Sequence, residues 1–186
     1  MAQGFDLQFC HFGIYVSDLS KMTDFYHRVM GFPITDEGPL HGAPMVFFSR
    51  NPREHHQIVL VAGRPKDAAD DKVINQLSFR VASLGEVRRF YLRIRDEAMA
   101  SDVHPICHGH AWSVYFRDPE GNRIEVYTDT PWYVHQPVRE EMDFALPEDE
   151  IERRTETLAR SLPGFKTAEE WRGGLVRAID ALAAQG

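Results

Sequence analysis

The stretch CHFGIYV, residues 10–16, is repeated 65 positions later as NQLSFRV, residues 75–81. The similarity continues through the segments that follow, where a Phe-Tyr pair recurs at the same offset in both halves. An internal repeat of this kind indicates two copies of one supersecondary unit that pack together. The repeat therefore decides the fold, and it places His11 of the first copy at the position that Gln76 occupies in the second.

Each stretch alternates between apolar residues and residues of other kinds, which is the pattern of a β-strand with two different faces. In residues 9–16, His11 shares the less apolar face with a glycine and a tyrosine. In residues 76–82, Gln76 shares the corresponding face with a serine and an arginine. A face of this composition packs poorly but suits a cavity lining, so we expect both side chains to point into a cavity.

The rest of each repeat reads as one helix and three short strands. Apolar residues at helical spacing run from Leu19 to Val29 and from Val87 to Ile94, and Gly31 ends the first helix. Each repeat is therefore predicted to be a β-α-β-β-β module. The strands expected after the helices cover residues 33–36, 45–50 and 56–62 in the first module and 103–107, 111–117 and 122–128 in the second.

We predict an α+β fold in which two tandem βαβββ modules, residues 8–63 and 74–130, form a curved mixed sheet around a cup. Residues 131–186 form a C-terminal extension, with one helix beginning near Pro147 and another at Thr167. We expect these helices to pack on the protein itself or on a second subunit, without a catalytic role. The second helix carries an apolar stripe made of Trp171, Leu175, Ile179 and Leu182.

Length and composition limit which kinds of protein this chain can be. The 186 residues are enough for one compact domain or for two small modules that share a core. A formal net charge of −7 argues against nucleic acid or an anionic membrane as the main partner. Two cysteines cannot form a disulfide framework, and no stretch approaches the roughly 18 apolar residues of a membrane span. We therefore expect a cytoplasmic protein.

The segment ICHGHAWSVYFRDPEGNRIE, residues 106–125, reads as a hairpin whose turn is Asp-Pro-Glu-Gly. Glu125 lies at its end in an otherwise apolar run, where a carboxylate is costly unless it is paired or bound to a metal. Both explanations stay open on the residues alone. Several other histidines are expected to be ordinary surface or hydrogen-bonded residues, namely His27, His41, His104 and His135.

The duplicated module, with a histidine on its first strand and a glutamate on its last, resembles the vicinal oxygen chelate superfamily. This superfamily includes glyoxalases, fosfomycin and bleomycin resistance proteins and extradiol dioxygenases. Roughly residues 8–130 carry the resemblance, and within the superfamily the chain is most similar to the extradiol dioxygenases, which open catechol rings beside the diol. Their signature is matched here by His108, Val114, Tyr115, Asp118, Pro119, Gly121 and Glu125.

The resemblance implies a non-haem Fe(II) held in the cup by two histidines and one carboxylate. By this resemblance His11 is the first histidine and Glu125 the carboxylate, whereas Gln76 stands where the second histidine belongs. Gln76 can ligate through its amide oxygen, or His108 or His110 can reach the metal instead. Alternatively, the site has lost its metal and Gln76 forms hydrogen bonds in a binding cavity. Mn(II), Ni(II) and Zn(II) tolerate such ligands as well as Fe(II).

The same resemblance implies roles for three further side chains. His56 corresponds to a histidine that moves a proton and stabilises bound oxygen, Tyr115 to a donor toward a catecholate oxygen, and His108 to a further cavity histidine. Overlaying the prolines of the two modules places Ile58 where the second module has Glu125. Isoleucine cannot ligate a metal. The fourth ligand of glyoxalase-type members is therefore missing, which favours a three-ligand site.

The sequence thus predicts an Fe(II)-dependent extradiol ring-cleaving dioxygenase that acts on a catechol-type aromatic diol and dioxygen. We expect a homo-oligomer, a dimer or larger, with neither nucleic acid nor membrane as a partner. One alternative is a glyoxalase- or epimerase-like metal-dependent isomerase. The other is a non-catalytic protein that binds a small aromatic or antibiotic-like molecule.

Overall fold

The computed structural model of the chain describes residues 9–65 and 74–183, so most of the expected linker, residues 64–73, lies outside the described residues. The first repeat folds into one strand, one helical segment and three further strands, in the predicted order. The strands form a four-stranded sheet in the order β1-β4-β3-β2, in which β1 runs parallel to β4. The elements are β1 (Phe12–Val16), α1 (Leu19–Asp24), the π-helical turn η1 (Phe25–Val29), β2 (Ile34–Leu40), β3 (Ala43–Phe48) and β4 (Ile58–Ala62).

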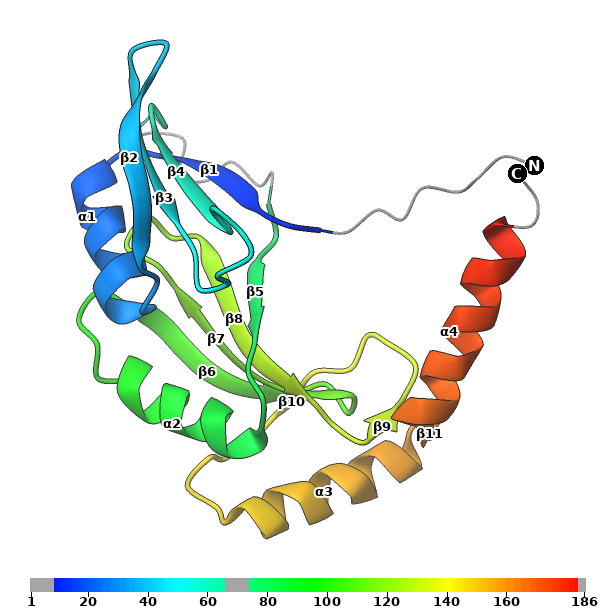
Figure 1. Ribbon diagram of the computed structural model, residues 1–186. Coiled ribbons are helices and arrows are strands. Elements are labelled where there is room, and N and C mark those ends of the chain that lie inside the picture. Colours follow the sequence, from blue (N-terminus) through cyan, green and yellow to red (C-terminus); the bar gives the residue numbers. More distant parts are fainter. Residues whose placement is uncertain (1–8, 66–73, 184–186) are drawn as a thin grey trace.

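The second repeat has the same order of elements. Its sheet is five-stranded, in the order β10-β6-β7-β8-β5, because β10 (Glu140–Glu141) of the C-terminal extension pairs with β6. Figure 1 shows the two sheets with their helices on one side of each. The elements of the second repeat are β5 (Leu77–Arg80), α2 (Leu84–Ile94), β6 (Ser101–Cys107), β7 (Ala111–Arg117) and β8 (Arg123–Asp129).

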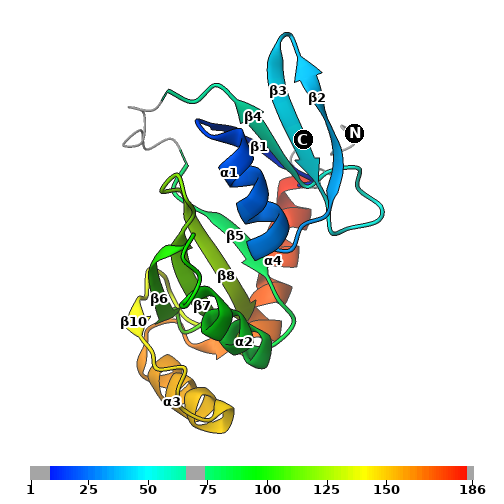
Figure 2. The same cartoon turned by 90° about the vertical axis from the view of Figure 1, so that its left-hand side faces the viewer.

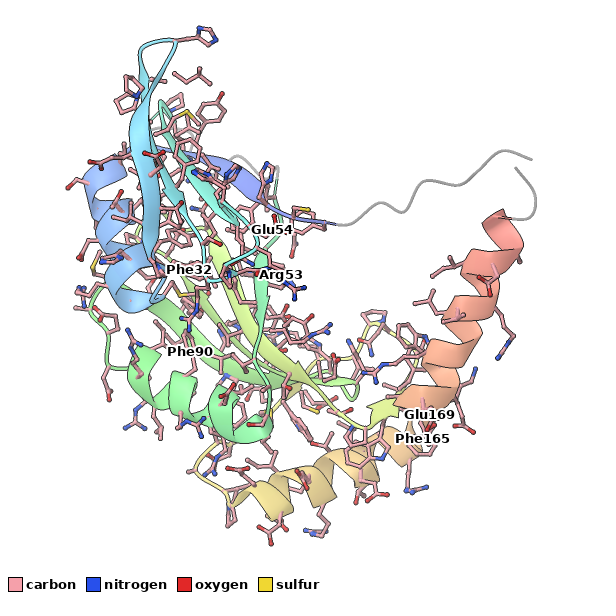
Figure 3. The ribbon with its side chains drawn as sticks, in the orientation of Figure 1. Phe32, Arg53, Glu54, Phe90, Phe165 and Glu169 are labelled. Atoms are coloured by element: carbon pink, nitrogen blue, oxygen red, sulfur yellow. The ribbon has the colours of Figure 1, made fainter. Side chains whose placement is uncertain are left out.

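The predicted α+β class is confirmed. The strands of the two modules form two separate sheets, however, where one continuous curved sheet was expected. Within the described residues, no hydrogen-bonded ladder joins the edge strands β1 and β5. Side chains fill the junction instead, because the ring centroids of Phe12 and Phe79 are 6.3 Å apart and those of Phe32 and Phe79 are 5.6 Å apart. Figure 3 shows the position of Phe32 at this junction.

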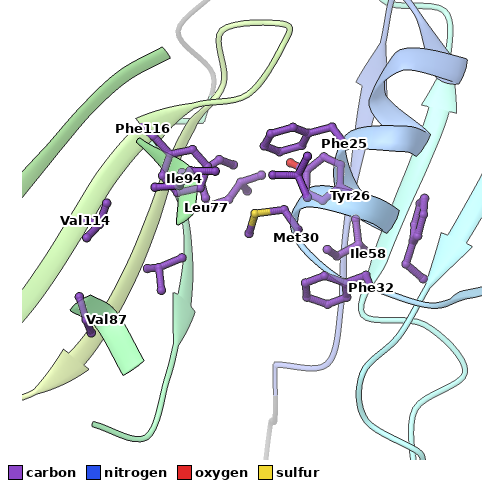
Figure 4. Close-up of a cluster of buried hydrophobic side chains, with 14 of the residues drawn as sticks. Phe25, Tyr26, Met30, Phe32, Ile58, Leu77, Val87, Ile94, Val114 and Phe116 are labelled. Carbon is purple, nitrogen blue, oxygen red and sulfur yellow. The ribbon is translucent and has the colours of Figure 1, made fainter. Parts of the chain in front are cut away.

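One apolar core joins the two modules. In Figure 4, Phe25, Tyr26 and Met30 of the first module point toward Leu77 and Phe116 of the second. All five side chains are buried. Burial of such a side chain contributes about 1.5–3 kcal/mol. The core therefore holds the modules together. Helices α1 and α2 cover one face of their sheets and leave the other face uncovered (Figure 1).

The turn between β7 and β8 adds a polar link between the modules. One carboxylate oxygen of Glu120 accepts the backbone N–H groups of Ser17 at 2.7 Å and Asp18 at 2.8 Å, at the beginning of α1. Beside it, the buried hydroxyl of Tyr26 donates to Asp118 at 3.4 Å. The Asp-Pro-Glu-Gly sequence therefore not only forms the hairpin turn but also satisfies free N–H groups of a helix in the other module.

The C-terminal extension begins with β9 (Trp132–Tyr133) and then crosses to the helix-covered side of the second sheet, where α3 (Glu148–Ser161) lies beside α2 (Figure 2). The indole N–H of Trp112 donates to the hydroxyl of Thr155 at 2.8 Å. The rings of Tyr91 and Phe144 lie 5.4 Å apart. The expectation that this helix packs on the protein is confirmed, because α3 completes the apolar layer that α2 begins.

The last helix, α4 (Ala168–Ala183), follows the short strand β11 (Lys166–Thr167), which pairs with β9. The predicted capping box is present: Glu170 accepts from the Thr167 backbone N–H at 2.8 Å, and the Thr167 hydroxyl accepts from the Glu170 N–H at 3.1 Å. The apolar stripe is not buried, since Leu175 is 45% exposed and Ile179 is 56% exposed, and the side chain of Leu182 lies outside the described residues. None of the helices in the described residues is both long and apolar enough to cross a membrane.

Candidate functional site

The helix-free face of the second sheet forms the floor of a cleft of about 1160 Å³. Strands β5, β7 and β8 place polar side chains on this floor because every second residue of a strand points to the same face. The wall comes from the C-terminal extension, where the stacked rings of Tyr133 and Trp171 lie 5.1 Å apart. A cleft with polar groups on the floor and aromatic rings in the wall suits a small aromatic ligand.

Glu125 lies at the centre of the floor and is only 7% exposed. One of its carboxylate oxygens accepts from the hydroxyls of Ser113 at 2.8 Å and Tyr115 at 2.6 Å. The other accepts from the amide of Gln76 at 2.9 Å and the hydroxyl of Ser78 at 2.6 Å. Four neutral donors therefore stabilise the buried carboxylate, so hydrogen bonding explains how it is tolerated in the sheet.

Tyr115 connects Glu125 to His108. The Nδ1 of His108 lies 2.5 Å from the backbone carbonyl of Val138, and its Nε2 lies 2.9 Å from the Tyr115 hydroxyl. A carbonyl only accepts, so Nδ1 carries a hydrogen and Nε2 of the neutral ring is an acceptor. Tyr115 then has one proton for two acceptors, Glu125 and His108. The arrangement can accept one further proton at Nε2, from a hydroxyl group bound in the cleft.

Burial raises the pKa of Tyr115, and its hydrogen bond to the Glu125 carboxylate raises it further. The phenol therefore remains a hydrogen-bond donor throughout the physiological range. His104, expected to be an ordinary histidine, stacks on Tyr115 with ring centroids 5.8 Å apart and lines the cleft. His110 also lines it, and its pKa is lowered mainly because burial disfavours the charged ring.

His11 and His56 lie together at a different place, against the first sheet. Their ring centroids are 4.4 Å apart, and His56 also packs on Phe47 at 5.3 Å and contacts His55, with 3.0 Å between the two Nδ1 atoms. The pKa of His56 is lowered, first by burial and then by the positive charges of its two histidine neighbours. Within the described residues, no hydrogen bond or ring contact joins this group to Glu125.

The structure therefore brings together two subsets of the predicted site residues. Gln76, Tyr115, His108 and Glu125 share the cleft of the second sheet, and His11 and His56 lie outside its lining. A smaller cleft of about 710 Å³ lies between the modules and is bordered by Gln76 and by both neighbours of His11, Cys10 and Phe12. His11 directly precedes β1, and its two neighbours lie on the same cleft as Gln76.

The predicted three-ligand metal centre of His11, Gln76 and Glu125 stays a prediction. Both oxygens of Glu125 are engaged by neutral donors, and Gln76 presents its amide nitrogen to this carboxylate. His11 contacts His56 instead of either of them. Across residues 9–65 and 74–183 there is no group of three or more His, Cys, Asp or Glu side chains that could hold a metal ion.

The strand register corrects one detail of the sequence alignment. In the first module Gly13 pairs with Val59, and in the second Ser78 pairs with Glu125, so Val59 and not Ile58 corresponds to Glu125. Ile58 points into the core and is fully buried. The two loops before these strands differ by one residue, which an overlay of prolines does not reveal. Valine cannot ligate either, so the absence of a fourth ligand stands.

Sequence reasoning missed the residues that hold this site in place. Ser78 and Ser113 donate to Glu125, and the carbonyl of Val138 orients His108. The two serines could have been found, because each lies two residues along a strand from a predicted site residue and shares its face. No local signal pointed to Val138 or to the ring stack of the wall, which come from the C-terminal extension.

Residues 8–126 match the family described as the glyoxalase/bleomycin resistance protein/dioxygenase superfamily. The chain belongs to this superfamily. The resemblance expected from the sequence is therefore confirmed. The match ends before the C-terminal extension, which supplies the wall of the cleft.

Among curated proteins, biphenyl-2,3-diol 1,2-dioxygenase 3 of Rhodococcus globerulus is 28% identical over 175 residues, which cover 89% of this chain and 82% of the relative. Among solved structures, a glyoxylase/bleomycin resistance protein/dioxygenase domain from Frankia sp. EAN1pec is 18% identical with a TM-score of 0.55, over 70% of this chain and all of the other. The fosfomycin resistance protein FosX of Listeria monocytogenes, in complex with Mn(II) and sulfate, is 20% identical with a TM-score of 0.51, over 70% of this chain and 95% of the other. These structures share the superfamily fold.

Proposed function

We propose that the chain is an extradiol-type dioxygenase that opens the ring of an aromatic vicinal diol. The proposal is carried by one observation: two hydrogen bonds link Glu125 to Tyr115 and Tyr115 to His108, on the floor of a cleft with an aromatic wall. The similarity to a dioxygenase for biphenyl-2,3-diol supports it, because that similarity extends over most of both chains.

In this proposal the cleft binds the diol through its two hydroxyl groups. The Tyr115 hydroxyl hydrogen-bonds one diol oxygen, and His108 accepts a proton from the other at the Nε2 atom. The Val138 carbonyl keeps the imidazole in the tautomer that leaves Nε2 free to accept. The Tyr133–Trp171 stack packs against the ring and excludes water from one side of the cleft.

An enzyme of this type requires a divalent metal, which in extradiol enzymes supplies the site where diol and dioxygen meet. We expect Fe(II), with His11, Gln76 and Glu125 as the ligands and His56 beside them as the proton-transfer residue. This assignment requires a different arrangement of Gln76 and Glu125 from the one described, since their polar atoms are now directed at each other. Metal loading is therefore the first property to measure.

The test is anaerobic loading with Fe(II), removal of unbound metal, and measurement of iron per chain. The loaded protein is then exposed to oxygen with a panel of catechols while the absorbance of the yellow ring-fission product is followed. Bound iron with yellow product supports the proposal. Bound iron without product from any catechol in the panel contradicts it.

A second candidate is a non-catalytic protein that binds an aromatic molecule in the same cleft. It is favoured by one observation, the hydrogen bond of 2.9 Å from the Gln76 amide to Glu125, because Gln76 then stabilises the cavity and does not ligate a metal. Protein that takes up no iron but binds catechols would support this candidate and exclude the dioxygenase. The glyoxalase-like isomerase has less support, because Val59 stands at the position of its fourth ligand.

A further inference from the structure

The cleft is rich in arginine although the chain as a whole carries a net charge of −7. Four guanidinium groups line it, while its acidic lining residues are Asp102, Glu125 and Asp129. A local excess of positive charge in a concave site concentrates anionic ligands there. The four arginines are Arg80, Arg123, Arg139 and Arg172.

Two of the four are engaged by the same acid. Arg172 of α4 lies 3.2 Å from the carboxylate of Asp129, and Arg80 of β5 lies 3.7 Å from the same oxygen. Arg80 also donates to the hydroxyl of Tyr127 at 3.0 Å. Asp129 is therefore shared between two cations, and these interactions fasten the beginning of α4 to the edge of the sheet.

The remaining acids of the lining are also accounted for. Asp102 pairs with Arg117 at 3.2 Å. Glu125 accepts from four neutral donors, as described above. Within the described residues, neither Arg123 nor Arg139 forms a hydrogen bond or an ion pair with any acid.

These two free guanidinium groups line the same cleft as the proposed diol site. Arg123 lies two residues before Glu125 on β8, so both side chains point to the same face of the sheet. Arg139 directly follows Val138, whose carbonyl holds His108. A ligand whose hydroxyl groups meet Tyr115 and His108 therefore lies in the same cleft as both cations.

We infer that the aromatic diol bound in this cleft carries a carboxylate, and that Arg123 and Arg139 form its carboxylate subsite. The diol part of this inference rests on the proposed function. Arginine suits the task because its planar group donates two parallel hydrogen bonds to a carboxylate. The aromatic wall holds the ring, and the two arginines distinguish acidic diols from neutral ones of the same size.

The test compares two ligands that differ only in this charge, 3,4-dihydroxyphenylacetate and its methyl ester. Binding is measured without oxygen by quenching of tryptophan fluorescence, since Trp132 and Trp171 line the cleft. We expect the acid to bind about ten-fold more tightly than the ester at low salt, and the difference to shrink near 0.5 M salt, where charges are strongly screened.

The variant carrying both Arg123→Gln and Arg139→Gln should bring the ratio of the two affinities close to one. The matched control carries both Arg89→Gln on α2 and Arg153→Gln on α3, which removes the same two charges from side chains that are 72% and 66% exposed outside the cleft. The control should retain the wild-type ratio. A ratio that falls equally in the control would mean that net charge, and not the subsite, causes the preference, and would overturn the inference.

The outcomes separate this inference from the proposed function. Tighter binding of the acid without ring opening would uphold the carboxylate subsite and overturn the dioxygenase. Equal or tighter binding of the ester, with ring opening, would uphold the dioxygenase and overturn the subsite. Failure of both ligands to bind would overturn both.

Discussion

The link between the modules through Glu120 allows a quantitative prediction. Its carboxylate side chain is only 9% exposed and accepts two backbone N–H groups at the beginning of α1, at 2.7 and 2.8 Å. Arg64 lies 3.5 Å from the same carboxylate. Replacing Glu120 with alanine removes both hydrogen bonds and the negative charge near the positive end of the helix.

The expected loss follows from these contacts. A hydrogen bond to a charged group contributes about 1.5 kcal/mol or more, so two contribute about 3 kcal/mol. Glu120→Gln retains one acceptor oxygen and loses only the charge, so we expect a loss of about 1 kcal/mol. Glu156→Gln is the matched control, because it breaks an exposed pair with Arg160 on α3, and such pairs contribute about 0.5 kcal/mol or less.

The assay is urea unfolding followed by circular dichroism, with the free energy of unfolding obtained from the transition midpoint and slope. The order of stability should be wild type and Glu156→Gln, then Glu120→Gln, then Glu120→Ala. If Glu120→Ala were no less stable than the Glu156 control, the carboxylate would not link the modules. Equal losses for Glu120→Ala and Glu120→Gln would show that charge alone matters and that the hydrogen-bond geometry is irrelevant.

Three further predictions concern the site and the C-terminal extension. Glu125→Ala should abolish iron binding while the circular dichroism spectrum stays native; unchanged iron per chain would remove Glu125 from the ligand set. Gln76→His should raise the affinity for Fe(II) in an anaerobic titration, and an identical affinity would place residue 76 away from the metal. Thr155→Val should lower the free energy of unfolding by about 1–3 kcal/mol in urea, because it leaves the buried N–H of Trp112 without an acceptor; an unchanged value would mean that α3 does not depend on this contact.

Much of the fold could be predicted from local patterns. Period-two alternation located β1 and β5, which begin directly after His11 and Gln76. The capping box at Thr167 fixed the beginning of α4 to the residue, because that signal involves only residues in one helical turn. Strand and helix bounds elsewhere agree with the predicted ranges to within a few residues.

The site was predicted less completely because its contacts are long-range. The sequence singled out Glu125 as a carboxylate in need of a partner, but its partners lie on or directly before β5 and β7, the two strands that pair with β8. The register of β1 against β4 decided that Val59, not Ile58, matches it. A one-residue difference between loops changes which face a side chain occupies, and sequence spacing alone does not record it.

The sequence by itself determined the duplicated βαβββ pattern, the polar faces of the strands and the superfamily, since each depends on residues close together in the chain or on a repeat. Only the tertiary structure decided that Gln76 hydrogen-bonds Glu125, that His11 lies with His56, and that the C-terminal extension forms the wall of the cleft. The physical reason is that periodicity specifies which way a side chain points. What it meets there depends on how strands, modules and the extension pack across distances that no local pattern encodes.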